Sequence, residues 1–119
     1  MGEVRSVKAL INVDMIGDRD LKLVVEYNSD PQLRQMAIDV ARQLGYPALF
    51  EQYPTAIEDD HIPFAKLGVP TLNLIDFSYG PDHRFWHTPE DTIDKLSAAS
   101  FQTVGDLVLG LVQRLRSRP

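Results

Sequence analysis

Hydrophobic residues occur along the chain in short runs rich in Val, Ile and Leu, the pattern of buried strands. VKALINVDMI (7–16) is one such run, and its strand is expected to end near Asp14. LKLVVEY (21–27) follows after a short turn, and two strands so close in sequence are expected to form an antiparallel pair. PALFEQY (47–53) and VPTLNLIDF (69–77) are the other candidates. The pattern therefore predicts four strands.

Two longer segments repeat apolar residues at helical spacing. The first opens at Asp30, an N-cap acid followed by Pro31, and stops at Gly45. The second follows Ser97, a residue suited to capping. Their apolar stripes are expected to pack in the core: Leu33, Met36, Ala37, Val40, Ala41 and Leu44 in the first, and Phe101, Val104, Val108, Leu111, Val112 and Leu115 in the second. HIPFAKLG (61–68) is long enough for a turn or two of helix.

Strands that alternate with helical segments predict an α/β fold in which helices pack on a largely parallel central sheet. At 119 residues the chain has room for a single hydrophobic core. In such sheets the loops at strand ends carry the chemistry. Three polar segments stand at these positions: Asp14, residues 58–61 before the fourth strand, and residues 86–88 after it. We expect them to converge.

Composition narrows the class of function. A net charge of −5, with scattered basic residues, argues against sequence-independent binding to nucleic acid. The chain has no cysteine, so disulfides and thiolate zinc sites are excluded. No apolar run approaches the roughly 20 residues that span a bilayer. The N-terminal residues lack the pattern of a signal peptide, so the compartment stays open, including secretion or the periplasm for a parent protein.

Two acidic segments of the chain could carry catalytic or metal-binding chemistry. Asp14 interrupts an apolar strand, and a buried carboxylate needs a cation, a metal or several hydrogen-bond donors. Glu58, Asp59 and Asp60 precede His61, and adjacent carboxylates raise one another's pKa in a dry site, which suits a proton carrier. The alternative is an acidic loop in which Asp60 caps the short helix that follows.

Trp86 and His87 form the third candidate. An aromatic side chain beside an imidazole can line a pocket while the ring binds a metal. The TPEDT that follows predicts a helix start, with Thr88 as the cap and Pro89 at the first helical position. HExxH, GxSxG and glycine-rich phosphate loops are absent from the sequence, which removes three common enzyme classes.

Four motifs stand in order along the chain: DMIGD (14–18), EDDHIPF (58–64), GVP (68–70) and WHTPEDT (86–92), before a long closing helix. Together they resemble the C-terminal half of the zinc-dependent aminopeptidase family that also contains the glutaminyl-peptide cyclotransferases. The resemblance extends from Val7 to Leu115. It implies an incomplete, C-terminal part of a zinc-peptidase-like sandwich.

The resemblance also implies roles for four residues. His87 matches the family's zinc-binding histidine, and Asp14 matches a ligand of the second zinc in the aminopeptidases or a hydrogen-bonding acid in the single-zinc cyclases. Asp59 matches an acid of the proton-handling network, and Trp86 matches a residue that lines the substrate pocket. One or two zinc ions are therefore implied for a complete domain, with a peptide or N-terminal aminoacyl group as substrate.

Residues 1–119 are accordingly expected to form a single partial domain. The family's other zinc ligands and its glutamate general base precede the DMIG strand, whereas Glu3 is the only carboxylate or histidine among the thirteen residues before Asp14. A catalytic zinc takes about three protein ligands. We expect a parent protein that is a zinc-dependent aminopeptidase or a glutaminyl cyclase, and little or no activity from this chain alone.

A non-catalytic function is the alternative to this enzymatic one. The chain could be a non-catalytic α/β association module derived from the same fold. A half-domain that lacks its neighbouring strands exposes a sheet edge, so self-association through that edge is expected.

Overall fold

The computed structural model describes residues 6–57, 59–78 and 88–117. Its strands form two parallel pairs. β1 (Leu10–Asp14) pairs with β4 (Thr71–Ile75) in a continuous register that places Asn12 opposite Asn73. β2 (Leu23–Glu26) pairs with β3 (Phe50–Thr55), with one irregularity in the register. Both ladders are parallel, as the alternation of strands and helices predicts.

β4 lies between β1 and β2. The backbone N–H of Asp30 donates to Thr71 O at 2.7 Å, and at the opposite end of β4 the N–H of Lys22 donates to the Asp76 carboxylate at 3.1 Å. β2 therefore runs antiparallel to β4. The predicted pairing of segments 7–16 and 21–27 with each other is wrong, because the fully buried β4 occupies the position between them.

The two long helices begin and end as the sequence predicts. In α2 (Pro31–Gln43) the Asp30 carboxylate accepts the Leu33 N–H at 3.0 Å, and Gly45 follows the helix with a φ of 92°, which favours glycine. α4 (Ala98–Ser117) begins where the Ser97 hydroxyl accepts the Ala99 N–H at 3.2 Å. Each cap satisfies a backbone donor that the helix itself leaves unpaired.

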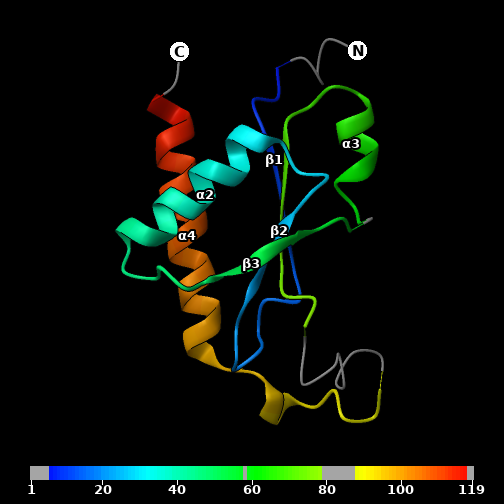
Figure 1. Cartoon of the computed structure of the whole chain (residues 1–119), viewed down its shortest axis with the longest axis vertical. Helices are drawn as coiled ribbons and strands as arrows, with labels where there is room; N and C mark the ends of the chain where they lie inside the picture. Colours follow the sequence, from blue (N-terminus) through cyan, green and yellow to red (C-terminus); the bar gives the residue numbers. More distant parts are fainter. Residues whose placement is uncertain (1–5, 58, 79–87, 118–119) are drawn as a thin grey trace.

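α2 and α4 lie together on one side of the strands (Figure 1). Between them and the strands is the main core, whose buried members are Leu23, Leu33, Ala37, Val40, Ala41, Leu49, Leu72, Leu74, Val104, Leu107 and Leu111. The buried face of α4 differs from the predicted stripe, because Leu107 is buried while Phe101 and Val112 are exposed. A smaller cluster of Val24, Ile57 and Ile75 forms a second core.

The segments around the candidate motifs form short structures. α3 (Ile62–Lys66) is a single short helix, as expected. The predicted helix start at Thr88 is wrong: the Thr88 carbonyl and hydroxyl accept the N–H groups of Asp91 and Glu90 in a turn, followed by the 3-10 helix η2 (Ile93–Lys95). This stretch has no apolar stripe to bury, and Ile93 is 86% exposed. Among the described residues, no helix is long and apolar enough to cross a membrane.

Candidate active site at the strand ends

Asp14 is the last residue of β1, and the chain turns sharply directly after it. Met15 adopts the left-handed conformation with a φ of 52°, which costs a side-chain-bearing residue about 1–2 kcal/mol. Such strain persists where the surrounding structure imposes it, commonly beside functional groups. Left-handed positions are usually occupied by glycine or asparagine, and position 15 has neither. The sequence therefore gives no sign of the left-handed conformation at Met15.

The structure places the Asp59 carboxyl within hydrogen-bonding reach of Asp14. Burial, the hydrogen bond with Asp59 and the negative charge of Asp59 together raise the pKa of Asp14, while a hydrogen bond from the Met15 backbone opposes the shift. When two carboxyl groups lie within hydrogen-bonding reach of each other, sharing one proton is more favourable than ionising both. Two of the three predicted segments therefore converge, and they form a group that can hold and release a proton.

The orientation of Asp59 is defined by two donors. Asn12 Nδ2 donates to Asp59 Oδ2 at 3.0 Å, and the Asp60 backbone N–H donates to Asp59 Oδ1 at 2.8 Å. Asn12 lies on β1, two residues before Asp14, so both acids are held by the same strand. Asn12 is not among the residues predicted from the sequence, although a polar residue within an apolar strand is a usable signal.

His61 and Asp60 do not join the carboxyl pair. The His61 side chain is fully buried, and its Nε2 lies 2.6 Å from Oε1 of Glu26, which is 1% exposed. Asp60 is exposed and does not cap α3, because His61 stands at the N-cap position and no side chain caps the helix. Glu26 is a second residue that sequence reasoning missed, and its signal is an acid that closes the apolar strand LVVE.

A further buried carboxyl group lies at the end of β4. Asp76 is fully buried, and burial together with the neighbouring Asp18 raises its pKa to about 7. The N–H of Lys22 and the Ser78 hydroxyl donate to it and oppose the shift. Asp18 accepts the Asp20 N–H at 3.0 Å and is also buried.

Trp86 and His87 lie outside the described residues, as does Glu58, so their predicted roles stay predictions. Within the described part of the chain, no group of three or more His, Cys, Asp or Glu residues could hold a metal ion. Asp14 and Asp59 supply two carboxylates, fewer than the three protein ligands of a catalytic zinc. The described donor set therefore does not fit a zinc site by itself, and no reaction step through zinc is derived from it.

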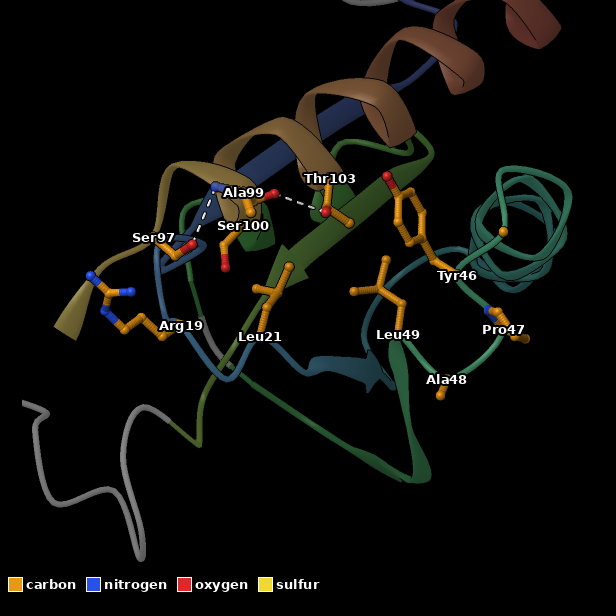
Figure 2. A pocket seen from close by; sticks show the side chains of 11 residues that line it. Arg19, Leu21, Tyr46, Pro47, Ala48, Leu49, Ser97, Ala99, Ser100 and Thr103 are labelled. Carbon is orange, nitrogen blue, oxygen red and sulfur yellow. Dashed lines mark hydrogen bonds between the residues drawn. The ribbon is translucent and has the colours of Figure 1, made fainter.

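A hollow opens near the N-terminus of α4 (Figure 2). It is lined by Arg19, Leu21, Gly45, Tyr46, Pro47, Ala48, Leu49, Ser97, Ala99, Ser100 and Thr103. Several of its polar groups already have partners: Arg19 Nε donates to Asp94 O, the Ser97 hydroxyl accepts the Ala99 N–H, and the Thr103 hydroxyl donates to Ala99 O. None of the predicted site residues lines it, so it is not a candidate active site.

Comparisons with known proteins identify relatives of both predicted kinds. A probable leucine aminopeptidase of Arthroderma benhamiae is 31% identical over 95% of this chain. The crystal structure of a glutaminyl cyclase from an Acidobacteriales bacterium superposes on 99% of the chain with a TM-score of 0.94 and 43% identity. A zinc aminopeptidase of Bacillus subtilis superposes on 94% of it with a TM-score of 0.72 and 25% identity.

The chain spans only part of each of these proteins: 32% of the fungal aminopeptidase, 42% of the cyclase chain and 29% of the Bacillus aminopeptidase. Peptidase family M28 matches residues 2–112, nearly the whole sequence. The α/β fold with parallel strand pairs agrees with these relatives. This chain therefore belongs to peptidase family M28.

Proposed function

We propose that this chain supplies the C-terminal half of a zinc-dependent site that acts on peptide N-termini, as an aminopeptidase or as a glutaminyl cyclase. The observation that carries the proposal is the Asp14–Asp59 carboxyl pair, which lies at the end of β1 and holds a raised pKa at Asp14. Relatives of both catalytic types share the fold around it. Zinc is the metal that the family implies.

The proposal gives a role to each candidate residue. Asp59 moves protons at the reacting group, held in place by Asn12. Asp14 shares a proton with Asp59 or contributes a metal ligand, His87 binds zinc, and Trp86 lines the pocket for the N-terminal residue. The remaining ligands and the general base come from outside this chain, so the chain alone should have little or no turnover.

The first test is an activity assay of the purified chain with added zinc. Aminoacyl anilides report aminopeptidase activity, and peptides with N-terminal glutamine report cyclisation. We expect neither product above background. Robust turnover that disappears in Asp59→Asn would show that the chain has a complete site of its own and would overturn the half-site proposal.

Calorimetric titration with zinc tests the ligands directly. We expect weak binding that is lost in His87→Ala and weakened in Asp14→Ala, with Asp20→Ala as a control, because Asp20 is an exposed carboxylate of the turn that follows β1. Zinc binding that is equal in all four proteins would contradict the assignment of His87 and Asp14.

A second candidate function is association, and an exposed apolar surface favours it. Among the described strands, β1 pairs only with β4, which leaves one edge of β1 free. Beside this strand lies a shallow groove lined by Val13, Ile16, Phe101, Val104, Gly105, Val108, Leu109 and Val112. Self-association would cover the free edge and the groove together.

Sedimentation of the chain over a range of concentrations tests association. We expect Leu109→Glu to shift the equilibrium towards monomer, because Leu109 is 58% exposed within the groove. Ile93→Glu is the control, since Ile93 is 86% exposed and does not line the groove. A purely associating module also predicts that His87→Ala changes none of these properties. A chain that stays monomeric at all concentrations would rule out self-association.

A further inference from the structure

Glu26 is a buried carboxylate with an unusually complete set of donors. It is 1% exposed at the end of β2. Its Oε2 accepts the backbone N–H of Asn28 at 2.6 Å and of Ile57 at 3.1 Å. Its Oε1 accepts the Ser29 hydroxyl at 3.2 Å and lies 2.6 Å from His61 Nε2. Ionised oxygens with several donors form stronger hydrogen bonds than neutral ones.

Two of these partners of Glu26 stand on either side of Asp59 in the sequence. Ile57 precedes Asp59 by two residues and His61 follows it by two. Each contacts a different oxygen of Glu26, so a single buried carboxylate holds the chain on both sides of the acid. These two contacts with Glu26, at the end of β2, therefore limit how far the chain around Asp59 can move.

The Asp59 side chain itself is held from β1. Asn12 and Asn73 are partners in the β1–β4 ladder, so their side chains lie side by side. Asn12 Nδ2 donates one hydrogen to Asp59 Oδ2 and one to Asn73 Oδ1, at 3.0 and 2.9 Å. Both amide hydrogens are thus used, and the Asn12 side chain has one satisfactory orientation.

Ser29 joins these two supports. The Asn73 backbone N–H donates to the Ser29 hydroxyl oxygen at 2.9 Å, and that hydroxyl donates to Glu26. The result is a continuous set of hydrogen bonds from Glu26 through Ser29, Asn73 and Asn12 to Asp59, across three strands. A buried carboxylate–imidazole pair adds little to the free energy of unfolding, because apolar residues of similar volume often stabilise the fold as well. We therefore explain the Glu26–His61 pair by the position that it gives to the chain around it.

We propose that Glu26 and Asn12 are positioning residues for Asp59: Glu26 holds the chain on both sides of the acid and Asn12 sets the direction of its carboxyl group. The proposal rests on the role proposed above for Asp59 and extends it to residues that do not meet the substrate.

NMR spectroscopy of the full chain tests this without any turnover. Three-bond couplings to the Asp59 side chain report whether its χ1 angle occupies one staggered state or several. We expect one state in the unaltered chain and averaging over several in both Asn12→Leu, which keeps the branched shape but removes both hydrogen-bond donors, and Glu26→Gln. In Glu26→Gln the Ile57 amide should also exchange roughly fivefold faster or more. Glu51→Gln, a carboxylate on the neighbouring β3, is the control and should leave the couplings unchanged.

A single χ1 state for Asp59 in both variants, with dispersed spectra, would overturn the proposal. If Glu26→Gln does not fold, Ser29→Ala replaces it, because this variant removes the hydrogen bonds that link Glu26 to Asn73 but keeps the Glu26 carboxyl group. A single χ1 state for Asp59 in Ser29→Ala would count equally against the proposal. Loss of folding in all three variants would indicate a role in folding alone and would also refute it. Failure of zinc binding or turnover leaves these couplings measurable, so the two proposals fail separately.

Discussion

Carboxyl groups at the strand ends differ in the partners that surround them. Glu26 meets a histidine and three hydrogen-bond donors. Asp14 meets another carboxyl group, Asp59, and Asp76 meets Asp18. A carboxyl group beside a second acid keeps its proton to a higher pH, because two negative charges close together repel each other. Burial and these partners together raise the pKa of Asp14 and of Asp76.

Asp76 makes the stability of the chain depend on pH. Folding raises the pKa of Asp76 from 3.8 to about 7, so its favourable contribution is complete below pH 3.8 and is lost as the pH rises through about 7. At about 1.4 kcal/mol per unit, the loss is at most roughly 4 kcal/mol. We expect urea unfolding to show lower stability at pH 8 than at pH 5, and a smaller difference in Asp76→Asn.

The control for this prediction is Asp20→Asn, which alters an exposed acid in the turn that also contains Asp18. It should preserve the pH dependence of the unaltered chain. The same difference between pH 5 and pH 8 in Asp76→Asn and in the unaltered chain would show that another group is responsible.

At the scale of elements, α4 carries the sharpest contrast between two faces. One face packs against α2 so closely that a Cβ added at Gly110 would lie 2.7 Å from Cγ1 of Val40. On another face, a Cβ at Gly105 would meet no atom within 4 Å. The two glycines look alike in the sequence, and only the crossing of α2 and α4 distinguishes them.

Alanine at each glycine should therefore have opposite effects. Replacing a glycine in a helix interior gains about 1 kcal/mol of helix propensity, so Gly105→Ala should be stabilising by up to that amount. Gly110→Ala gains the same propensity but overpacks against buried Val40, which costs about 1–3 kcal/mol, so its net effect should be destabilising. Urea unfolding measures both, and equal effects would show that the helices separate easily.

At the scale of the molecule, the strands have unequal cover. α2 and α4 bury the larger cluster on one side, and the smaller cluster contains only three fully buried residues. The outer surface of α4 and the adjoining end of β1 expose apolar side chains, including Phe101 and Leu109. The chain spans 42% of the related cyclase.

Leucines on the two faces of α4 should differ in their effect on global stability. Leu107 is fully buried in the main core, so Leu107→Ala should cost about 2–5 kcal/mol. Leu109 is 58% exposed, and Leu109→Ala should change stability by about 0.5 kcal/mol or less. Denaturant unfolding followed by circular dichroism tests the pair. A large loss in Leu109→Ala would show that this surface is already covered in solution, for example by a second copy.

Local signals in the sequence determined the two long helices, the four strands and the candidate acids. Asp30 and Gly45 act through contacts with residues a few positions away, which is why α2 could be predicted together with its ends. The four ordered motifs were sufficient for the family. Prediction was wrong for the pairing of β1 and β2 and for the buried face of α4, because both depend on elements distant in the sequence.

The fold class predicted that the polar segments at the strand ends converge, but only the tertiary structure decided which individual side chains contact one another. Asp14 and Asp59 are 45 positions apart, Asn12 and Asn73 are 61 apart, and Glu26 and His61 are 35 apart. Hydrogen bonds and pKa shifts depend on distances of a few ångströms, and no local pattern encodes these separations. The sequence therefore predicted Asp59 as a candidate acid, whereas only the fold showed that Asn12 donates to its carboxylate and that Glu26 contacts the chain on either side of it.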